Sequence, residues 1–217
     1  NMLAQFIPPL KWFDFDPFAI TGSVHSYAIF PKHFYKVEGV ELSHTSVDLG
    51  VPLGAWRAPP NSINVFYTES TMDELAYLAE IDPLEYRLKF ITESPRHKAV
   101  LEQVAKQAGW GRTLPEGHGR GIAINEWFPL EDAVTVVAQV AEVSITSRGK
   151  LKVHRVDCVI DCGFAVNPDS VRAQMEGSII MGMSAALFEK ITLEDGRVAQ
   201  SNFDDYRIAR MRDTPEI

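Results

Sequence analysis

The feature that most constrains the fold is a pair of long β-branched runs separated by a short turn. Residues 133–146 read AVTVVAQVAEVSIT and residues 150–163 read KLKVHRVDCVIDCG, with Ser147, Arg148 and Gly149 between them. β-Branched residues favour strands, and a short glycine-containing turn joins antiparallel neighbours. The pattern therefore predicts a β-hairpin, and its nearly continuous valines and isoleucines predict that both faces are covered.

Three helices are expected before this hairpin. The first begins at Ser70, whose hydroxyl is suited to cap the start of a helix. The second has Asp82 as its cap and Pro83 at its first position, and the third spans residues 98–108 and ends at Gly109. A helix-rich segment therefore precedes the strands.

Two stretches rich in glycine and proline divide the chain. Residues 47–62, VDLGVPLGAWRAPPNS, predict a structured loop, and residues 111–121, GRTLPEGHGRG, predict a connector between domains. The hairpin, a helix and a second hairpin turning at Asp195 and Gly196 follow the connector. The expected fold class is α+β, with a helix-rich segment followed by a β-hairpin/helix/β-hairpin arrangement.

The helix between the two hairpins is unusually poor in bulky side chains. Residues 172–190 read RAQMEGSIIMGMSAALFEK, and either Asn167 or Asp169 is suited to cap the helix. Gly177 and Gly182 interrupt it, although each glycine costs a helix about 1 kcal/mol relative to alanine. Two interpretations remain open: a strand or helix packs closely on this backbone, or a bound cofactor approaches it.

Composition excludes some classes of partner. The net charge of −8 and the pI near 5.3 argue against nucleic acid, which requires a basic face. Small anions remain compatible, because backbone amides at helix starts bind them. No transmembrane segment is expected, since the longest run of apolar or small residues, 177–188, falls short of the roughly 20 that span a bilayer.

The cysteines and histidines provide no recognisable metal site or nucleophile. Cys158 and Cys162 lie four residues apart in a strand-like run, about 13 Å, which is too far for a disulfide. We expect both to be small buried residues. None of the six histidines has the spacing of a metal-binding pair, and His154 lies too far along the strand to activate Cys158. No metal ligand or catalytic residue is predicted.

Two polar residues are candidates for ligand binding. Arg57 lies in the loop GAWRAPP, and its planar guanidinium is suited to bind a phosphate or carboxylate in bidentate fashion. The alternative is a surface salt bridge, which stabilises little. Gln174 is an amide expected in the first turn of the glycine-containing helix, where an anion would be held.

Residues 54–91 and 138–217 together resemble the large subunits of molybdenum hydroxylases, in the xanthine dehydrogenase/aldehyde oxidase family. The segments that carry the resemblance are GAWRAPPNSINVFYTESTMDELAYLAEIDPLEYRLKFI and the block from AQVAEVSIT to MRDTPEI. The most similar type is the isoquinoline 1-oxidoreductase beta subunit. The resemblance implies that residues 1–115 are the C-terminal part of a first molybdopterin-binding domain and residues 116–217 the N-terminal part of a second.

The resemblance also implies a set of site residues. The glutamine of the family's Q-x-E-G turn lies against molybdopterin, and the arginine of its Gly-x-Phe/Trp-Arg loop lies beside the molybdenum centre. In this sequence, the resemblance implies that the cofactor is bound by Arg57, Ala58, Gln174 and Gly177. It implies that the substrate pocket is lined by Trp56 and Pro59. Other branches carry an aromatic residue where this chain has Pro59. The family's catalytic glutamate follows the PEI block, beyond Ile217, so we expect no turnover by this chain alone.

The implied activity is hydroxylation of N-heteroaromatic compounds or aldehydes, with water as the oxygen source. Its implied cofactor is molybdopterin, either as the mononucleotide or in the cytosine dinucleotide form. The implied partners are the remainder of the large subunit and a small subunit with 2Fe-2S clusters, in either the periplasm or the cytoplasm. Two alternatives remain: a non-catalytic binding or scaffold domain derived from such a subunit, and an unrelated α+β hydrolase, for which no triad spacing is found.

Overall fold

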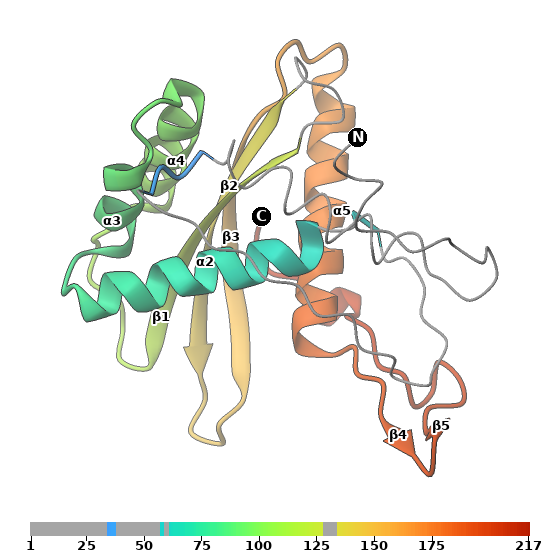
Figure 1. Cartoon of the computed structure of the whole chain (residues 1–217). Coiled ribbons are helices and arrows are strands. Elements are labelled where there is room, and N and C mark those ends of the chain that lie inside the picture. Colours follow the sequence, from blue (N-terminus) through green and yellow to red (C-terminus); the bar gives the residue numbers. More distant parts are fainter. Residues whose placement is uncertain (1–33, 38–56, 59–60, 128–133) are drawn as a thin grey trace, which may run out of the picture.

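The computed structural model describes residues 34–37, 57–58, 61–127 and 134–217 (Figure 1). The expected α+β class is confirmed. The helices and strands are α2 (Asn61–Leu78), α3 (Pro83–Phe90), α4 (Pro95–Ala108), β1 (His118–Trp127), β2 (Thr135–Ile145), β3 (Leu151–Asp161), α5 (Pro168–Leu187), β4 (Leu193–Glu194), β5 (Arg197–Val198) and the 3-10 turn η3 (Met211–Asp213). None of the helices within these residues has the length and apolar character needed to cross a membrane.

Three antiparallel strands in the order β1-β2-β3 form the sheet. The predicted hairpin is β2 and β3, and it turns where the sequence indicated. Strand β1 was not predicted, because its first residues, HGRG, belong to the expected connector 111–121. Pairing with β2, from His118 opposite Ser144 to Trp127 opposite Thr135, holds these glycines in extended conformation against their weak strand propensity.

The hydrophobic core lies between this sheet and α4. Val136 and Val140 of β2 are buried against Leu101 and Val104 of α4. The residues that alternate with these on β2, Val137 and Gln139, point to the other face and are only half-buried. The expectation that both faces are covered therefore holds for the α4 face and is wrong for the other, which stays half-buried. Figure 1 shows α3 and α4 on one side of the sheet and α5 on the other.

The helix ends follow the capping residues, with one exception. Asp82 accepts hydrogen bonds from Leu84 and Glu85 at the start of α3, as predicted. Helix α4 starts three residues before the predicted position and ends at Gly109, which has the expected left-handed conformation at φ 63°. Ser70 does not cap a helix, because α2 starts at Asn61 and passes through Ser70.

Helix α5 begins as the sequence indicated. Asn167 is the cap, and its side-chain oxygen accepts a hydrogen bond from the Ser170 amide at 3.1 Å. The second hairpin is confirmed but short, with two residues in each of β4 and β5. It turns at Asp195 (φ 50°) and Gly196 (φ 74°), the left-handed pair that a tight hairpin turn requires.

The two cysteines are free thiols, and neither is fully buried. Cys158 pairs with Gln139 of β2 and lies on the half-buried face of the sheet, away from α4. Cys162 follows the end of β3. The expectation of two buried residues is therefore wrong, because the core packs on the opposite face.

Candidate functional site

One face of α5 is exposed and nearly bare. Gln174, Gly177, Ser178, Met181 and Gly182 follow the spacing that places helical residues on one face. All of them except Ser178, which is half-buried, are exposed. On this face the helix presents the Gln174 carboxamide and the Met181 thioether. Gly177 lies between them, and Gly182 follows Met181.

The side chain of Arg57 lies along this face. Its Nη2 donates a hydrogen bond to Gln174 Oε1 at 3.4 Å, and its Nη1 points to the Met181 sulfur at 3.7 Å. The two acceptors are 117 and 124 residues away in sequence. The structure therefore brings together Arg57 and Gln174, the two residues that the sequence singled out on chemical grounds.

Arg57 keeps its charge available for an anion. Both of its partners are electrically neutral, and within the described part of the chain it forms no ion pair. The alternative of a surface salt bridge at Arg57 is therefore not observed among the described residues. A guanidinium beside an amide provides several donors and one acceptor, a set suited to phosphate or to a heterocycle edge.

The backbone next to Arg57 is held in an uncommon conformation. Ala58 has φ 61°, a left-handed value that costs a non-glycine residue free energy. Its carbonyl accepts a hydrogen bond from the Ser62 amide at 3.1 Å, and Asn61 donates to the Glu126 carbonyl at 3.0 Å. These two hydrogen bonds connect Ala58 to the start of α2, and the start of α2 to the end of β1.

The glycines of α5 are not explained by close packing within the described residues. A Cβ atom built on Gly177 or on Gly182 meets nothing within 4 Å. Helix α5 also makes at most isolated contacts with the other described helices and strands. Of the two interpretations left open, close packing of a strand or helix on these glycines is not observed here.

The position of Gln174 differs from the expected one. Helix α5 begins at Pro168, so Gln174 is its seventh residue and lies in the second turn. The amides that bind anions at a helix start belong to the first turn. Gln174 is therefore placed to act through its own carboxamide, together with Arg57. Trp56 and Pro59, the predicted pocket residues, lie outside the described residues.

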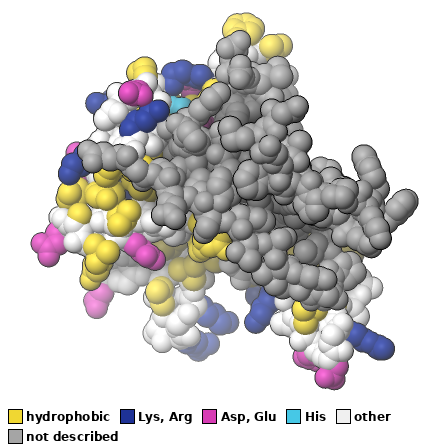
Figure 2. Space-filling view, in the orientation of Figure 1, with side chains coloured by type: hydrophobic (Ala, Val, Ile, Leu, Met, Phe, Trp, Pro, Cys, Tyr) yellow, Lys and Arg dark blue, Asp and Glu magenta, His cyan; other side chains and the backbone are white. Residues whose placement is uncertain are grey.

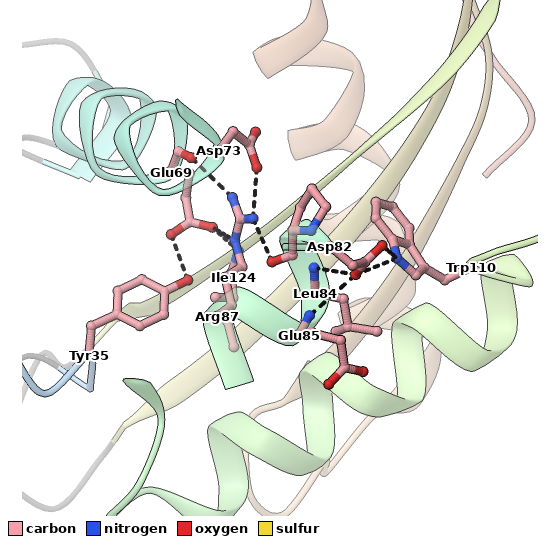
Figure 3. A network of polar contacts seen from close by, with 10 residues as sticks. Tyr35, Glu69, Asp73, Asp82, Leu84, Glu85, Arg87, Trp110 and Ile124 are labelled. Carbon is pink, nitrogen blue, oxygen red and sulfur yellow. Dashed lines mark hydrogen bonds and ion pairs between the residues drawn. The ribbon is translucent and has the colours of Figure 1, made fainter. Parts of the chain in front are cut away.

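Sequence reasoning missed a buried polar network that joins the helices to β1 (Figure 3). Arg87 of α3 is fully buried and donates to Glu69 Oε2 at 2.9 Å and Asp73 Oδ1 at 2.7 Å. Glu69 also accepts the Tyr35 hydroxyl and the Ile124 amide, each at 3.0 Å. A signal was present in DPLEYRLKFI, where Arg87 occupies a position on the apolar side of a short helix.

Burial and charge act in opposite directions on the two members of this network, Arg87 and Glu69. Burial is the largest single influence and lowers the pKa of Arg87, but its acidic neighbours, with Glu69 first among them, together outweigh burial, so the pKa is raised. Burial raises the pKa of Glu69, although the charge and hydrogen bonds of Arg87 act in the opposite direction. Burial, and then the charge of Glu69, raise the pKa of Tyr35, so that its hydroxyl stays a donor. The network joins α2, α3, β1 and the segment around Tyr35 into one unit, and its role is structural.

A family model, the molybdopterin cofactor-binding domain, matches residues 68–215. The chain belongs to the large-subunit family of the molybdenum hydroxylases. Molybdopterin is the cofactor of this family. Among the described residues, no group of three or more His, Cys, Asp or Glu side chains is placed to hold a metal ion. The match extends across residues 115 and 116, and the division into two domains there stays a prediction.

Three relatives illustrate the molybdenum hydroxylases to which the chain is similar. The beta subunit of isoquinoline 1-oxidoreductase from Brevundimonas diminuta is 40% identical over 154 residues, covering 70% of this chain and 19% of that protein. The B subunit of nicotinate dehydrogenase from Pseudomonas putida is 37% identical over 174 residues, covering 74% and 14%. The molybdenum-binding subunit PaoC of aldehyde oxidoreductase from Escherichia coli O157:H7 is 27% identical over 205 residues, covering 88% and 27%. The chain thus spans less than a third of each of these relatives.

Proposed function

We propose that this chain is the portion of a molybdenum hydroxylase large subunit that contacts molybdopterin through Arg57 and Gln174. The complete enzyme would hydroxylate N-heteroaromatic compounds or aldehydes, with water as the source of oxygen. The names of the relatives, which include isoquinoline, nicotinate and aldehyde oxidoreductases, support this substrate class.

The observation that carries the proposal is the hydrogen bond between Arg57 and Gln174 across 117 residues of sequence. This hydrogen bond joins Arg57, from the loop, to Gln174, on an exposed face of α5. The glycines of that face leave open space beside the helix backbone. A flat heterocycle with a phosphate fits this donor set. Arg57 would bind the phosphate or another anionic group, and Gln174 would pair with the hydrogen-bonding edge of the ring.

Gly177 and Ala58 have supporting roles in this proposal. Gly177 lies one turn after Gln174 on the same face and lets the bound group approach the helix backbone. Ala58 holds the loop in the left-handed conformation that presents Arg57 to the face. Trp56 and Pro59 are proposed to border the substrate. When bound, the cofactor supplies the oxidising centre, and the residues of this chain hold and orient it.

The remaining components are proposed on the family resemblance. They are the rest of the large subunit, which supplies the catalytic glutamate, and a small subunit with 2Fe-2S clusters that removes the electrons. The cytosine dinucleotide form of the cofactor adds a second phosphate and a base, and Arg57 is a candidate to bind that phosphate as well.

The decisive measurement is molybdenum per polypeptide, by elemental mass spectrometry, on the complete large subunit with its partners from the native host. We expect stoichiometric metal in the wild type and a loss of more than half in Arg57→Ala and Gln174→Ala. Removing a charged hydrogen-bond donor costs about 1.5–3 kcal/mol, which is sufficient for such a loss. Arg148→Ala and Gln103→Ala change exposed residues of the same types away from the site and serve as matched controls. Full metal content in both site variants would contradict the proposal.

One observation favours the alternative of a non-catalytic binding domain. Helix α2 exposes the large side chains of Ile63 (62%), Phe66 (67%), Tyr67 (62%) and Tyr77 (83%), and exposed apolar patches often mark protein contacts. Figure 2 shows hydrophobic side chains gathered over α3 and the end of α2 next to it. A purified protein that carries no molybdenum and is held by a protein partner through these residues would support the alternative.

A further inference from the structure

The outer edge of β3 carries the beginning of a fourth strand. Glu216 forms a parallel bridge with Arg155, in which the Val156 amide donates to the Glu216 carbonyl at 2.8 Å and the Glu216 amide donates to the His154 carbonyl at 3.0 Å. Figure 1 shows the C-terminal end of the chain beside β3. The last residues therefore lie in strand register with the sheet.

Beyond this bridge, the edge of β3 has further groups that can pair. Amides alternate between the two sides of a strand, so those of Cys158 and Ile160 point to the same side as the Val156 amide. Within the described residues, no hydrogen bond between this side of β3 and another segment is observed beyond Val156. These amides belong to half-buried residues, for which an unpaired group costs free energy.

We propose that the polypeptide following Ile217 in the larger subunit forms a fourth strand, parallel to β3, along its edge from Val156 to Asp161. This inference rests on the proposed function, because it requires that the chain be part of a longer polypeptide. The register of the bridge carries Ile217 and about five further residues to the end of β3. The sheet then becomes mixed, with one parallel strand at its edge.

The register gives a specific neighbour for Cys158. Because Arg155 lies opposite Glu216, the residue opposite Cys158 is the second one after Ile217. A cysteine placed there should form a disulfide with Cys158 under mild oxidation, in a background where Cys162→Ser removes the other thiol. A cysteine at the third residue after Ile217 points to the opposite face of the sheet and serves as the matched control.

Hydrogen exchange of the complete large subunit, resolved to single amides by fragmentation in the mass spectrometer, provides a second test. Val159 pairs with Ala138 in the sheet and should be protected in any case. A paired edge protects Cys158 and Ile160 about as strongly, so protection runs continuously along the strand. An open edge leaves Cys158 and Ile160 exchanging quickly between protected neighbours.

The outcomes separate this inference from the proposed function. A disulfide at the second position only, with continuous protection, supports the fourth strand. Alternating protection and no disulfide overturn it, and molybdenum measured on the same sample shows independently whether the proposed function stands. Protection that appears only at high protein concentration would assign the edge to a second copy and would also overturn the inference.

Discussion

At the scale of single residues, the environment of Cys158 sets its reactivity. Burial raises the pKa of this thiol to about 11, although a hydrogen bond with Gln139 acts in the opposite direction. Thiolate is the reactive form, and an ordinary cysteine has a pKa of about 8.5. Cys158 is therefore mostly protonated at neutral pH and should react slowly with small alkylating reagents.

We expect iodoacetamide at pH 8 to modify Cys158 at least ten times more slowly in the folded protein than in urea. The thiolate fraction at that pH is on the order of 0.1% for a pKa of about 11, against roughly a quarter for an ordinary cysteine. Peptide mass spectrometry over time measures both rates. Equal rates with and without urea would contradict the raised pKa.

Asp161, at the end of β3, makes the stability of the folded chain depend on pH in the acid range. The Arg96 guanidinium, at 2.7 Å, and the Gly163 amide lower the pKa of this carboxyl to about 2. A depressed folded-state pKa gives stabilisation that is complete above about pH 4 and is lost as the pH falls toward 2. Asp161→Asn should lower Tm at pH 6 and match the wild type near pH 2. Asp204→Asn, at an exposed position, should lower it at neither pH.

At the scale of elements, the pair of Arg87 and Glu69 joins α3 to α2. Removing one member leaves an uncompensated buried charge, which costs about 3–5 kcal/mol. Arg87→Met should therefore lower the free energy of unfolding by that amount in urea titrations. Arg96→Met breaks a half-exposed pair with Asp161 and should cost about 1 kcal/mol or less. Similar losses for the two variants would show that burial is not what makes Arg87 important.

Replacing Gly177 by alanine should affect helix stability and cofactor binding in opposite directions. Because an added Cβ meets nothing within 4 Å, Gly177→Ala should stabilise α5 by up to about 1 kcal/mol. If molybdopterin lies on this face, the same change should lower molybdenum content, measured per polypeptide. Gly182→Ala, farther along the same face, should stabilise the helix equally and lower the metal content less than Gly177→Ala. A Gly177→Ala protein with full metal content would remove Gly177 from the site.

The elements that the sequence predicted well are those with local signals. Asp82, Gly109, Asn167 and the pair Asp195–Gly196 act through hydrogen bonds or dihedral angles of their immediate neighbours, so a single sequence reveals them. Strand β1 and the first turns of α2 depend on pairing and packing with distant residues. Their local sequence, rich in glycine and polar residues, carries no comparable signal.

The candidate site was predictable in its residues and not in its geometry. Arg57 was identified by its loop and Gln174 by its place in a helix of small residues, but the contact between them spans 117 residues and requires the folded chain. Arg87 and Glu69 show the converse case. Each looks like an ordinary charged residue of a helix, and only the three-dimensional arrangement shows that they are buried together.

At the scale of the whole molecule, two exposed surfaces of the described residues are suited to bind a ligand or a partner. One is the face of α5 with Gln174 and Gly177, and the other is the apolar side of α2 around Phe66. The first suits a cofactor and the second a protein surface. Both agree with a chain that spans less than a third of each of three relatives.

The two edges of the sheet differ in which groups bind their backbone. At β1, the Ile124 amide is bound by Glu69 and the Glu126 carbonyl by Asn61, so side chains of α2 occupy the groups that another strand would need. Such occupation prevents strands of other molecules from adding to the sheet. In the part of the sheet that the structure describes, the proposed fourth strand would pair with the edge of β3 beyond Val156, where no such contacts are observed. Side chains of α2 thus protect part of the β1 edge from aggregation, and the proposed fourth strand would give the β3 edge the same protection.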